Sequence, residues 1–273
     1  GNAEGKSLPT VTPKTTNISQ VKSAALKVAG EQDFDNVILF GEDTQITPVA
    51  DGSHEVGEET HEYLYEAEVN LAPFVSRFEV KGIQCENLSN SKYKKIVLEA
   101  IGLMDYNNQF TLGGGKSEEM TITNVLEPGS TAEEGKYIFG ETSDTSNGEY
   151  TNYSWAWDKI TGATLTGSET VYNPTAGYYI YQFCPLQITG GKNVQIKLAI
   201  DPMGAVVTAR FQKQGTSGLE DLTSFEAGKI YRIDNYKFKV ENVKPWNPDE
   251  EICVNVVVKV QEWEVVPLTP VFE

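Results

Sequence analysis

Residues 251–262, close to the C-terminal end of the sequence, alternate between apolar and polar side chains. The apolar residues that would share one face of a strand are Ile252, Val254, Val256, Val258 and Val260. Alternation with a period of two is typical of a β-strand, and a strand with one apolar face needs a sheet beside it and a core beneath it. Glu262 then takes the next apolar position, and Trp263 and Val265 continue in the odd register. This change of phase predicts a bulge or a strand that changes partner.

Strand patterns also dominate the rest of the chain, separated by turns rich in Gly, Asn, Pro and Ser. The segments are 36–40, 63–71, 74–85, 121–126, 150–157, 177–188, 194–201, 205–213 and 231–240, and residues 93–104 hold an apolar run that fits either a strand or a short helix. Many strands of this length predict an antiparallel sandwich or barrel. One helix is expected over residues 17–30, where Asn17 is a suitable cap and Gly30 a suitable end. The fold class is therefore all-β with one short helix in the N-terminal part.

The best domain boundary lies near Leu71 and Pro73. It divides the chain into an N-terminal domain of residues 1–71 and a C-terminal β-sandwich domain of residues 72–273, which includes the terminal strand. The first of these holds one helix and two or three strands, which is little material for an independent sandwich.

Composition and charge exclude several classes of partner. The chain carries 39 Asp and Glu against 22 Lys and Arg, a net charge of -17, and it lacks the basic patch that a phosphate backbone requires. We therefore expect no nucleic acid partner. No apolar run approaches the roughly 20 residues of a membrane helix, so no membrane span is expected. Cys85, Cys184 and Cys253 lie far apart in sequence, which favours small buried side chains at strand positions over a metal or redox site.

No motif in the sequence supports catalysis. Residues 113–117, Gly-Gly-Gly-Lys-Ser, resemble the end of a phosphate-binding loop, but Phe110 stands where the motif requires its first glycine. His54 and His61, the two histidines, lack both zinc-protease spacing and an obvious nucleophile. Residues 144–149 offer oxygen ligands, yet they depart from the standard calcium loop and are better read as a turn. We expect a protein that is not an enzyme, with no catalytic residues, no cofactor and no metal.

Three aromatic side chains, Tyr153, Trp155 and Trp157, would project from one side of a strand. A row of aromatic rings can stack on sugar rings, so these residues are the candidates for glycan contact. Aromatic rows also fill sandwich cores, and we expect this more often. Exposure of the rings would favour the first interpretation, and burial would favour the second.

The extreme end of the sequence is apolar, whereas most chain ends are polar and fray. Its apolar residues are Val265, Val266, Leu268, Val271 and Phe272. Such a tail is expected to dock against its own domain or against another subunit. Pro267 and Pro270 each remove one backbone donor, which restricts how the tail can join a sheet.

Several of these segments together resemble the fimbrillins, the subunits of type V pili. The likeness is carried by Phe225–Ile233 with its Gly-Lys-x-Tyr strand, by Tyr236–Val240, by Asn247-Pro248, and by the valine-rich strand that ends in Gln261-Glu262-Trp263. Residues 69–80 are similar to the strand that opens the C-terminal domain of that family. The resemblance is good over about the last fifty residues and rests on strand patterns.

The resemblance implies a two-domain, transthyretin-like antiparallel β-sandwich, exported as an outer-membrane lipoprotein precursor and placed on the cell surface in a fimbria. It implies assembly with other fimbrial subunits by donor-strand exchange, with the apolar tail as donor, and adhesion to host or bacterial surface ligands. Residues 1–71 are short beside the family's N-terminal domain; either its first strands are missing from this sequence or this member has a reduced domain. Two alternatives remain: a tip or anchor component, or a surface glycan-binding lipoprotein.

Overall fold

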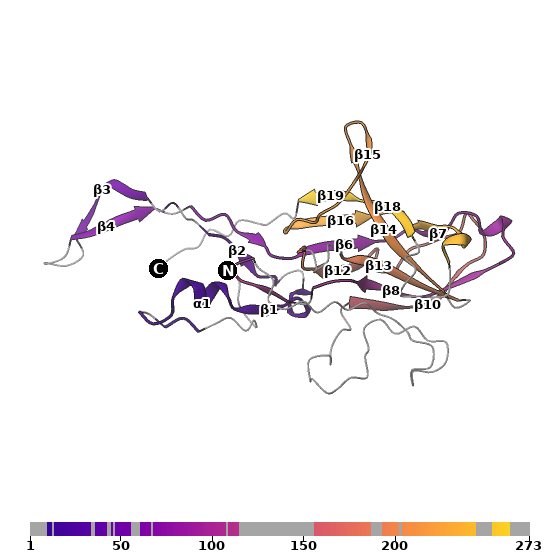
Figure 1. Cartoon of the computed structure of the whole chain (residues 1–273), viewed down its shortest axis with the longest axis horizontal. Helices are drawn as coiled ribbons and strands as arrows, with labels where there is room; N and C mark the ends of the chain where they lie inside the picture. Colours follow the sequence, from indigo (N-terminus) through magenta and orange to yellow (C-terminus); the bar gives the residue numbers. More distant parts are fainter. Residues whose placement is uncertain are drawn as a thin grey trace.

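The computed structural model describes residues 10–12, 14–33, 36–42, 45, 47–55, 61–66, 68–107, 109–114, 156–186, 193–201, 204–243 and 253–262. This part of the chain is mostly β, with several sheets and one short α-helix, which confirms the predicted fold class (Figure 1). None of the described helices has the length and apolar character needed to cross a membrane.

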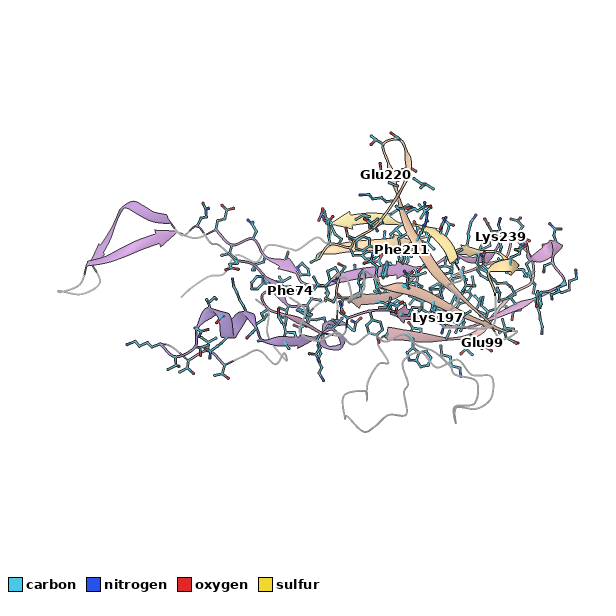
Figure 2. The ribbon with its side chains drawn as sticks, in the orientation of Figure 1. Phe74, Glu99, Lys197, Phe211, Glu220 and Lys239 are labelled. Carbon is cyan, nitrogen blue, oxygen red and sulfur yellow. The ribbon has the colours of Figure 1, made fainter. Side chains whose placement is uncertain are left out.

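The larger sheet of the sandwich is built around β14, its longest strand, with the order β10-β8-β13-β14. β13 pairs with the first residues of β14, β18 with its middle and β15 with its end. The bounds are β8 (Ile96–Met104), β10 (Trp157–Leu165), β13 (Gln195–Asp201), β14 (Gly204–Gly215), β15 (Gly218–Asp221) and β18 (Cys253–Val257). The β14–β15 hairpin projects from the body of the molecule, and Glu220 lies on it (Figures 1 and 2).

The facing sheet has the order β12-β6-β16-β19 and continues into a small sheet of order β11-β7-β17. The bounds are β6 (Ser76–Val80), β7 (Ile83–Cys85), β11 (Val171–Tyr172), β12 (Tyr179–Phe183), β16 (Lys229–Ile233), β17 (Lys237–Phe238) and β19 (Lys259–Glu262). Most described pairings are antiparallel, as expected, but β6 with β16, β7 with β17, and β14 with β18 are parallel.

A glycine allows the second sheet to bend between β6 and β7. Gly82 has φ of +69°, and a Cβ added there would lie 2.0 Å from the carbonyl oxygen of Asp234. Only glycine combines this left-handed backbone with such a close approach. The bend therefore brings the segment after β16 directly against the segment after β6.

Aromatic side chains fill the space between the two sheets. Phe78 on β6 stacks on Phe183 of β12 at 4.4 Å between ring centroids and on Phe211 of β14 at 5.2 Å. Phe225 and Tyr231 meet edge to face at 4.8 Å in the same cluster. Offset and edge-to-face contacts of this kind add to the stabilisation that burial provides. The core thus joins strands from both sheets.

The closing strand changes partner, but it does so at Val258 and not at Glu262, where the sequence places the break in phase. β18 pairs with β14 in the first sheet, whereas β19 pairs with β16 in the second. Val254, Val256 and Val258 are buried, and the Val258 N–H donates to the Gln212 carbonyl at 2.6 Å before the chain crosses. Val260, predicted to share their face, is 40% exposed. The phase therefore breaks between residues 258 and 260, because the chain leaves the core at the crossing.

The predicted helix over residues 17–30 is wrong in length: α1 spans only Ile18–Lys22. Asn17 caps it as expected, with its side chain accepting from the Gln20 N–H. Beyond it, β1 (Ala25–Lys27) pairs with β9 (Gln109–Thr111), and η1 (Val28–Glu31) follows. Leu26 and Val28 are buried at strand spacing, so tertiary packing overrides the helical stripe.

A second, smaller core lies where the N-terminal segment meets the sandwich. Its buried members are Leu26, Val28, Val37, Ile38, Val75, Phe110, Leu112 and Cys184. Nearby, β2 (Leu39–Phe40) pairs with β5 (Ala72–Pro73). The β3 (Thr47–Glu55) and β4 (His61–Glu66) hairpin lies at one end of the molecule (Figure 1). Residues before and after Leu71 share this core, and the division of the chain at residue 71 stays a prediction.

Candidate ligand and assembly surfaces

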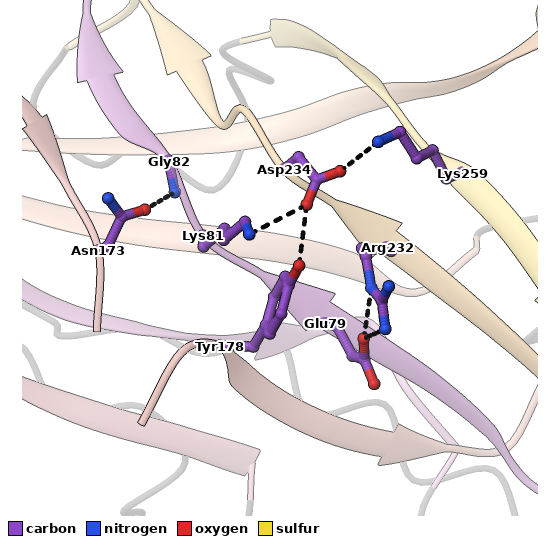
Figure 3. A network of polar contacts seen from close by, with 8 residues as sticks. All are labelled: Glu79, Lys81, Gly82, Asn173, Tyr178, Arg232, Asp234 and Lys259. Carbon is purple, nitrogen blue, oxygen red and sulfur yellow. Dashed lines mark hydrogen bonds and ion pairs between the residues drawn. The ribbon is translucent and has the colours of Figure 1, made fainter. Parts of the chain in front are cut away.

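A network of charged side chains covers the outer face of the second sheet (Figure 3). Phe78 and Val80 on β6 point into the core, so Arg77, Glu79 and Lys81 point to the opposite face. β16 runs beside β6 with Arg232 opposite Glu79. Arg232 donates to one oxygen of Glu79 from Nε at 2.7 Å and from Nη2 at 2.6 Å, while Nη2 of Arg77 lies 3.1 Å from the other oxygen. Glu79 is 4% exposed, and two cations compensate its charge.

Asp234, which follows β16, joins three other segments to this face (Figure 3). Its carboxylate accepts from Lys259 Nζ of β19 at 2.6 Å and from the Tyr178 hydroxyl at 3.0 Å, and it forms an ion pair with Lys81 at 3.5 Å. The ammonium of Lys81 lies 4.4 Å from the Tyr178 ring centroid, and the guanidinium of Arg232 lies 5.1 Å from it. Cation–π contacts of this kind fix the ring between the two charges.

These contacts keep the network charged near neutral pH. The hydrogen bond from Lys259 is the largest cause that lowers the pKa of Asp234. The hydrogen bond with Tyr178 raises the pKa of Lys81, and the hydrogen bond with Glu79 raises the pKa of Arg232. Each shift favours the ionised form of its group.

A groove of about 450 Å³ opens beside the network, between β16–β17 on one side and β18–β19 on the other. Its apolar lining consists of Phe238, Val254 and Val257, of which Val257 is 47% exposed. Its polar lining consists of Arg232, Lys237, Lys239, Lys259, Glu86, Asp234, Asn235, Asn242 and Asn255. The lining thus holds four cations and two carboxylates, and Glu79, which lies outside the lining, compensates the charge of Arg232.

Among the aromatic candidates, Trp157 alone lies within the described residues; Tyr153 and Trp155 lie outside them. Trp157 begins β10 and packs, half-buried, against Ala100 and Ala199. Ala156 beside it belongs to the main core, so Trp157 stands on the outer face of the first sheet. Trp157 thus packs on a small apolar cluster outside the main core, and both interpretations of the aromatic row, core packing and glycan contact, stay predictions.

The proposed donor residues Val265, Val266, Leu268, Val271 and Phe272 lie outside the described residues. The last described residue before them is Glu262, at the end of β19. β19 lies at one side of the second sheet and exposes all four of its side chains. The tail thus begins where the chain reaches the edge of a sheet.

The structure says less about the histidines, the glycine-rich loop, the possible calcium loop and the cysteines. In the β3–β4 register, His54 stands opposite Glu62 and His61 opposite Glu55. Gly113 and Gly114 follow β9, whereas residues 115–117 and 144–149 lie outside the described part. Within the described residues, no group of three or more His, Cys, Asp or Glu side chains is placed to hold a metal ion. Cys85 and Cys184 are buried, as predicted, and the side chain of Cys253 lies outside the described part.

Sequence reasoning missed the groove and its charged wall. The alternation of Arg77, Glu79 and Lys81 and the spacing of Arg232 and Asp234 show that polar residues share one face of each strand. They do not show that β6 and β16 are parallel neighbours, because the two strands are separated by about 150 residues. Register, which sequence alone does not provide, brings these charges together.

Neither a protein-family model nor a curated protein sequence matches the chain. Among solved structures, it is similar to a candidate cell adhesion protein from Parabacteroides distasonis, with a TM-score of 0.52 at 15% identity over 92% of this chain and 78% of that one. A second such protein from that organism gives a TM-score of 0.37 at 11% identity over 74% and 56%. A Bacteroides eggerthii candidate adhesion protein gives 0.39 at 12% identity over 84% and 64%. The first likeness shows a shared all-β fold.

Proposed function

We propose that the chain is a non-enzymatic structural subunit of a cell-surface fimbria that supports adhesion and assembles by donor-strand exchange. The fold shared with a candidate cell adhesion protein supports a surface role. Export through an outer-membrane lipoprotein precursor and pairing with other fimbrial subunits belong to the same proposal. A shaft subunit would both donate and accept a strand, whereas a tip or anchor component would use only one half of this exchange.

The observation that carries the proposal is the path of the closing strand. β18 and β19 take the chain from the first sheet to the edge of the second, and the apolar segment from residue 263 follows at once. An edge strand presents unpaired backbone groups, and an extended segment can satisfy such groups on a neighbouring molecule. β19 is paired with β16 through only four residues, so the tail leaves from a short strand.

The two tail prolines are compatible with a donor strand. Successive N–H groups of a strand point to opposite sides, and Pro267 and Pro270 are an odd number of residues apart. Each edge of the inserted strand therefore lacks one backbone N–H group, and neither edge lacks two. Leu268 lies between the prolines, and Phe272 shares its face. These two residues would provide the apolar contact with the receiving subunit.

The test is to place charge on that face in the full chain, in the double variant Leu268→Asp/Phe272→Asp. Thr269→Asp adds a charge within the same tail and serves as the control. We expect the double variant to lose polymers in light scattering while its far-UV circular dichroism and melting temperature stay unchanged, and the control to assemble. Normal polymerisation of the double variant would contradict the donor role. A large drop in its melting temperature would instead show that the tail packs on its own subunit.

The alternative of a surface glycan-binding lipoprotein keeps one supporting observation. The indole of Trp157 is partly exposed on the outer face of the first sheet, away from the main core. Trp157→Ala should then weaken retention on an immobilised neutral glycan array without changing assembly. Unchanged retention would remove the support that this residue provides.

A further inference from the structure

We propose that the groove between β17 and β18 binds an acidic saccharide, a sugar bearing a carboxylate or sulfate group. The inference deepens the proposed adhesion function, since it names the chemistry of the surface ligand. It rests on three properties of the groove: its charge, its hydrogen-bonding groups and its rigid wall.

The charge of the groove favours an anion. Glu86 forms an ion pair with Lys237 at 3.5 Å, and Asp234 forms one with Lys259 at 2.6 Å, so both carboxylates of the lining are compensated. Lys239 is exposed and forms no ion pair with another described residue. It interacts electrostatically with Glu241, whose carboxylate accepts hydrogen bonds from the Asn87 side chain, and its ammonium lines the groove, where a ligand can reach it. Arg232 is likewise compensated by Glu79, so Lys239 carries the excess positive charge among the lining residues.

The remaining lining suits a sugar. Asn235 and Asn255 are exposed, and their carboxamides, which both donate and accept, form no hydrogen bond with other described side chains. Such groups match the hydroxyls of a saccharide. The exposed side chain of Val257 lies in the same lining and offers an apolar surface for the C–H face of a ring. The volume of about 450 Å³ lies within the range of small-molecule sites, about 300–1,000 Å³.

A peptide or a nucleic acid fits less well. β17 is only two residues long, so an extended peptide would find few backbone groups to pair with on that side. The overall negative charge of the chain repels a polyanion as large as a nucleic acid. A short acidic sugar needs only the local charge of the groove.

The charged side chains that form one wall of the groove are held by other residues before any ligand binds. Arg232 is held by Glu79, and Asp234 is held by Tyr178 and Lys259, so binding would order few side chains (Figure 3). A pre-organised site loses less conformational entropy on binding than a flexible one.

The test is calorimetric titration of the full chain with a heparin-derived disaccharide that carries sulfate and uronate groups. Lys239→Glu reverses the charge at the mouth of the groove. Lys213→Glu reverses an exposed lysine on β14 and is the matched control. We expect Lys239→Glu to weaken binding by about tenfold or more, as a reversal of one nearby charge predicts. The control should bind like the original chain, and binding should fall as salt is raised.

Three outcomes would overturn the inference: no binding by the original chain, equal loss in both variants, or equally tight binding of a poly-glutamate peptide. An equal loss of affinity in both variants would show non-specific electrostatic attraction. Equally tight binding of poly-glutamate would show that the groove recognises negative charge and not a saccharide. Light scattering on the same samples keeps this test separate from the fimbrial proposal. Lys239→Glu should polymerise normally, so lost sugar binding with intact assembly concerns the groove alone.

Discussion

The buried lysine of β13 gives a sharp test of the packing. Lys197 lies opposite Gly102 of β8 and Val207 of β14, and it is 1% exposed (Figure 2). Burial lowers its pKa from 10.5 to about 7, because desolvation disfavours the charged ammonium. Lys197→Met keeps an unbranched side chain of similar length and removes the charge. We expect this variant to be more stable than the original chain at neutral and acidic pH.

The size and the sign follow from linkage. Below about pH 7 both the folded and the unfolded chain carry the proton, and the full desolvation penalty acts on the folded state. Between about 7 and 10.5 the folded state has lost the proton that the unfolded state still binds, so stability rises with pH. Above 10.5 both are neutral and the penalty is gone. At about 1.4 kcal/mol per pKa unit, the change over this window is on the order of 4–5 kcal/mol.

The assay is urea unfolding of both chains at pH 6, 8 and 10, followed by tryptophan fluorescence. The difference between the variant and the original chain isolates Lys197 from the other groups that titrate in this range. The advantage of Lys197→Met should be greatest at pH 6 and should shrink towards pH 10. An advantage that is constant across the three pH values would refute the desolvation argument, and so would a variant that is less stable at pH 6.

Three further substitutions test the core, the bend and the network. Phe78→Ala should lower the free energy of unfolding by about 3–5 kcal/mol, because it empties the centre of the aromatic cluster; a loss below about 1 kcal/mol in urea unfolding would contradict this. Gly82→Ala should cost about 2 kcal/mol or more, clearly more than Gly162→Ala, whose φ of +73° is similar but whose added Cβ meets no atom within 4 Å. Asp234→Asn should cost about 1 kcal/mol at pH 7. Since the bond to Lys259 lowers the pKa of Asp234 below 3.8, this difference should persist above pH 3.8 and vanish as pH falls through the folded pKa; a difference that persists at lower pH would contradict it.

Much of the fold follows from local patterns in the sequence. Alternation locates β13 and β14 closely, and it indicates a change of partner in the closing strand, although the chain crosses at Val258 and not at Glu262. It does not locate β15, because Gly218–Asp221 carries a single apolar side chain, Leu219, which is 52% exposed. The predicted helix is too long because here a local pattern is present but does not decide the structure. A stripe at helical spacing is present, but burial of Leu26 and Val28 at strand spacing stabilises the pairing with β9 more.

The candidate surfaces could be predicted only in part. An apolar tail and a row of aromatic residues are visible as composition, so the sequence names them directly. The groove is different, since its charged lining comes from β16, β17, β18 and β19 and from the segments between them. It exists because the chain crosses between sheets after Val258. No local pattern indicates which residues such a crossing brings together.

The central claim is that the tail after β19 joins a second copy of the chain, and a crosslink from within the tail tests it most directly. Leu268 is replaced by a photoreactive phenylalanine analogue, and equal amounts of nitrogen-15-labelled and unlabelled chains are assembled, irradiated and digested for mass spectrometry. Donor-strand exchange predicts crosslinked peptides that pair a labelled with an unlabelled chain in about half of the products. Crosslinks confined to peptides of a single label would show that the tail folds back on its own subunit, and would contradict the account.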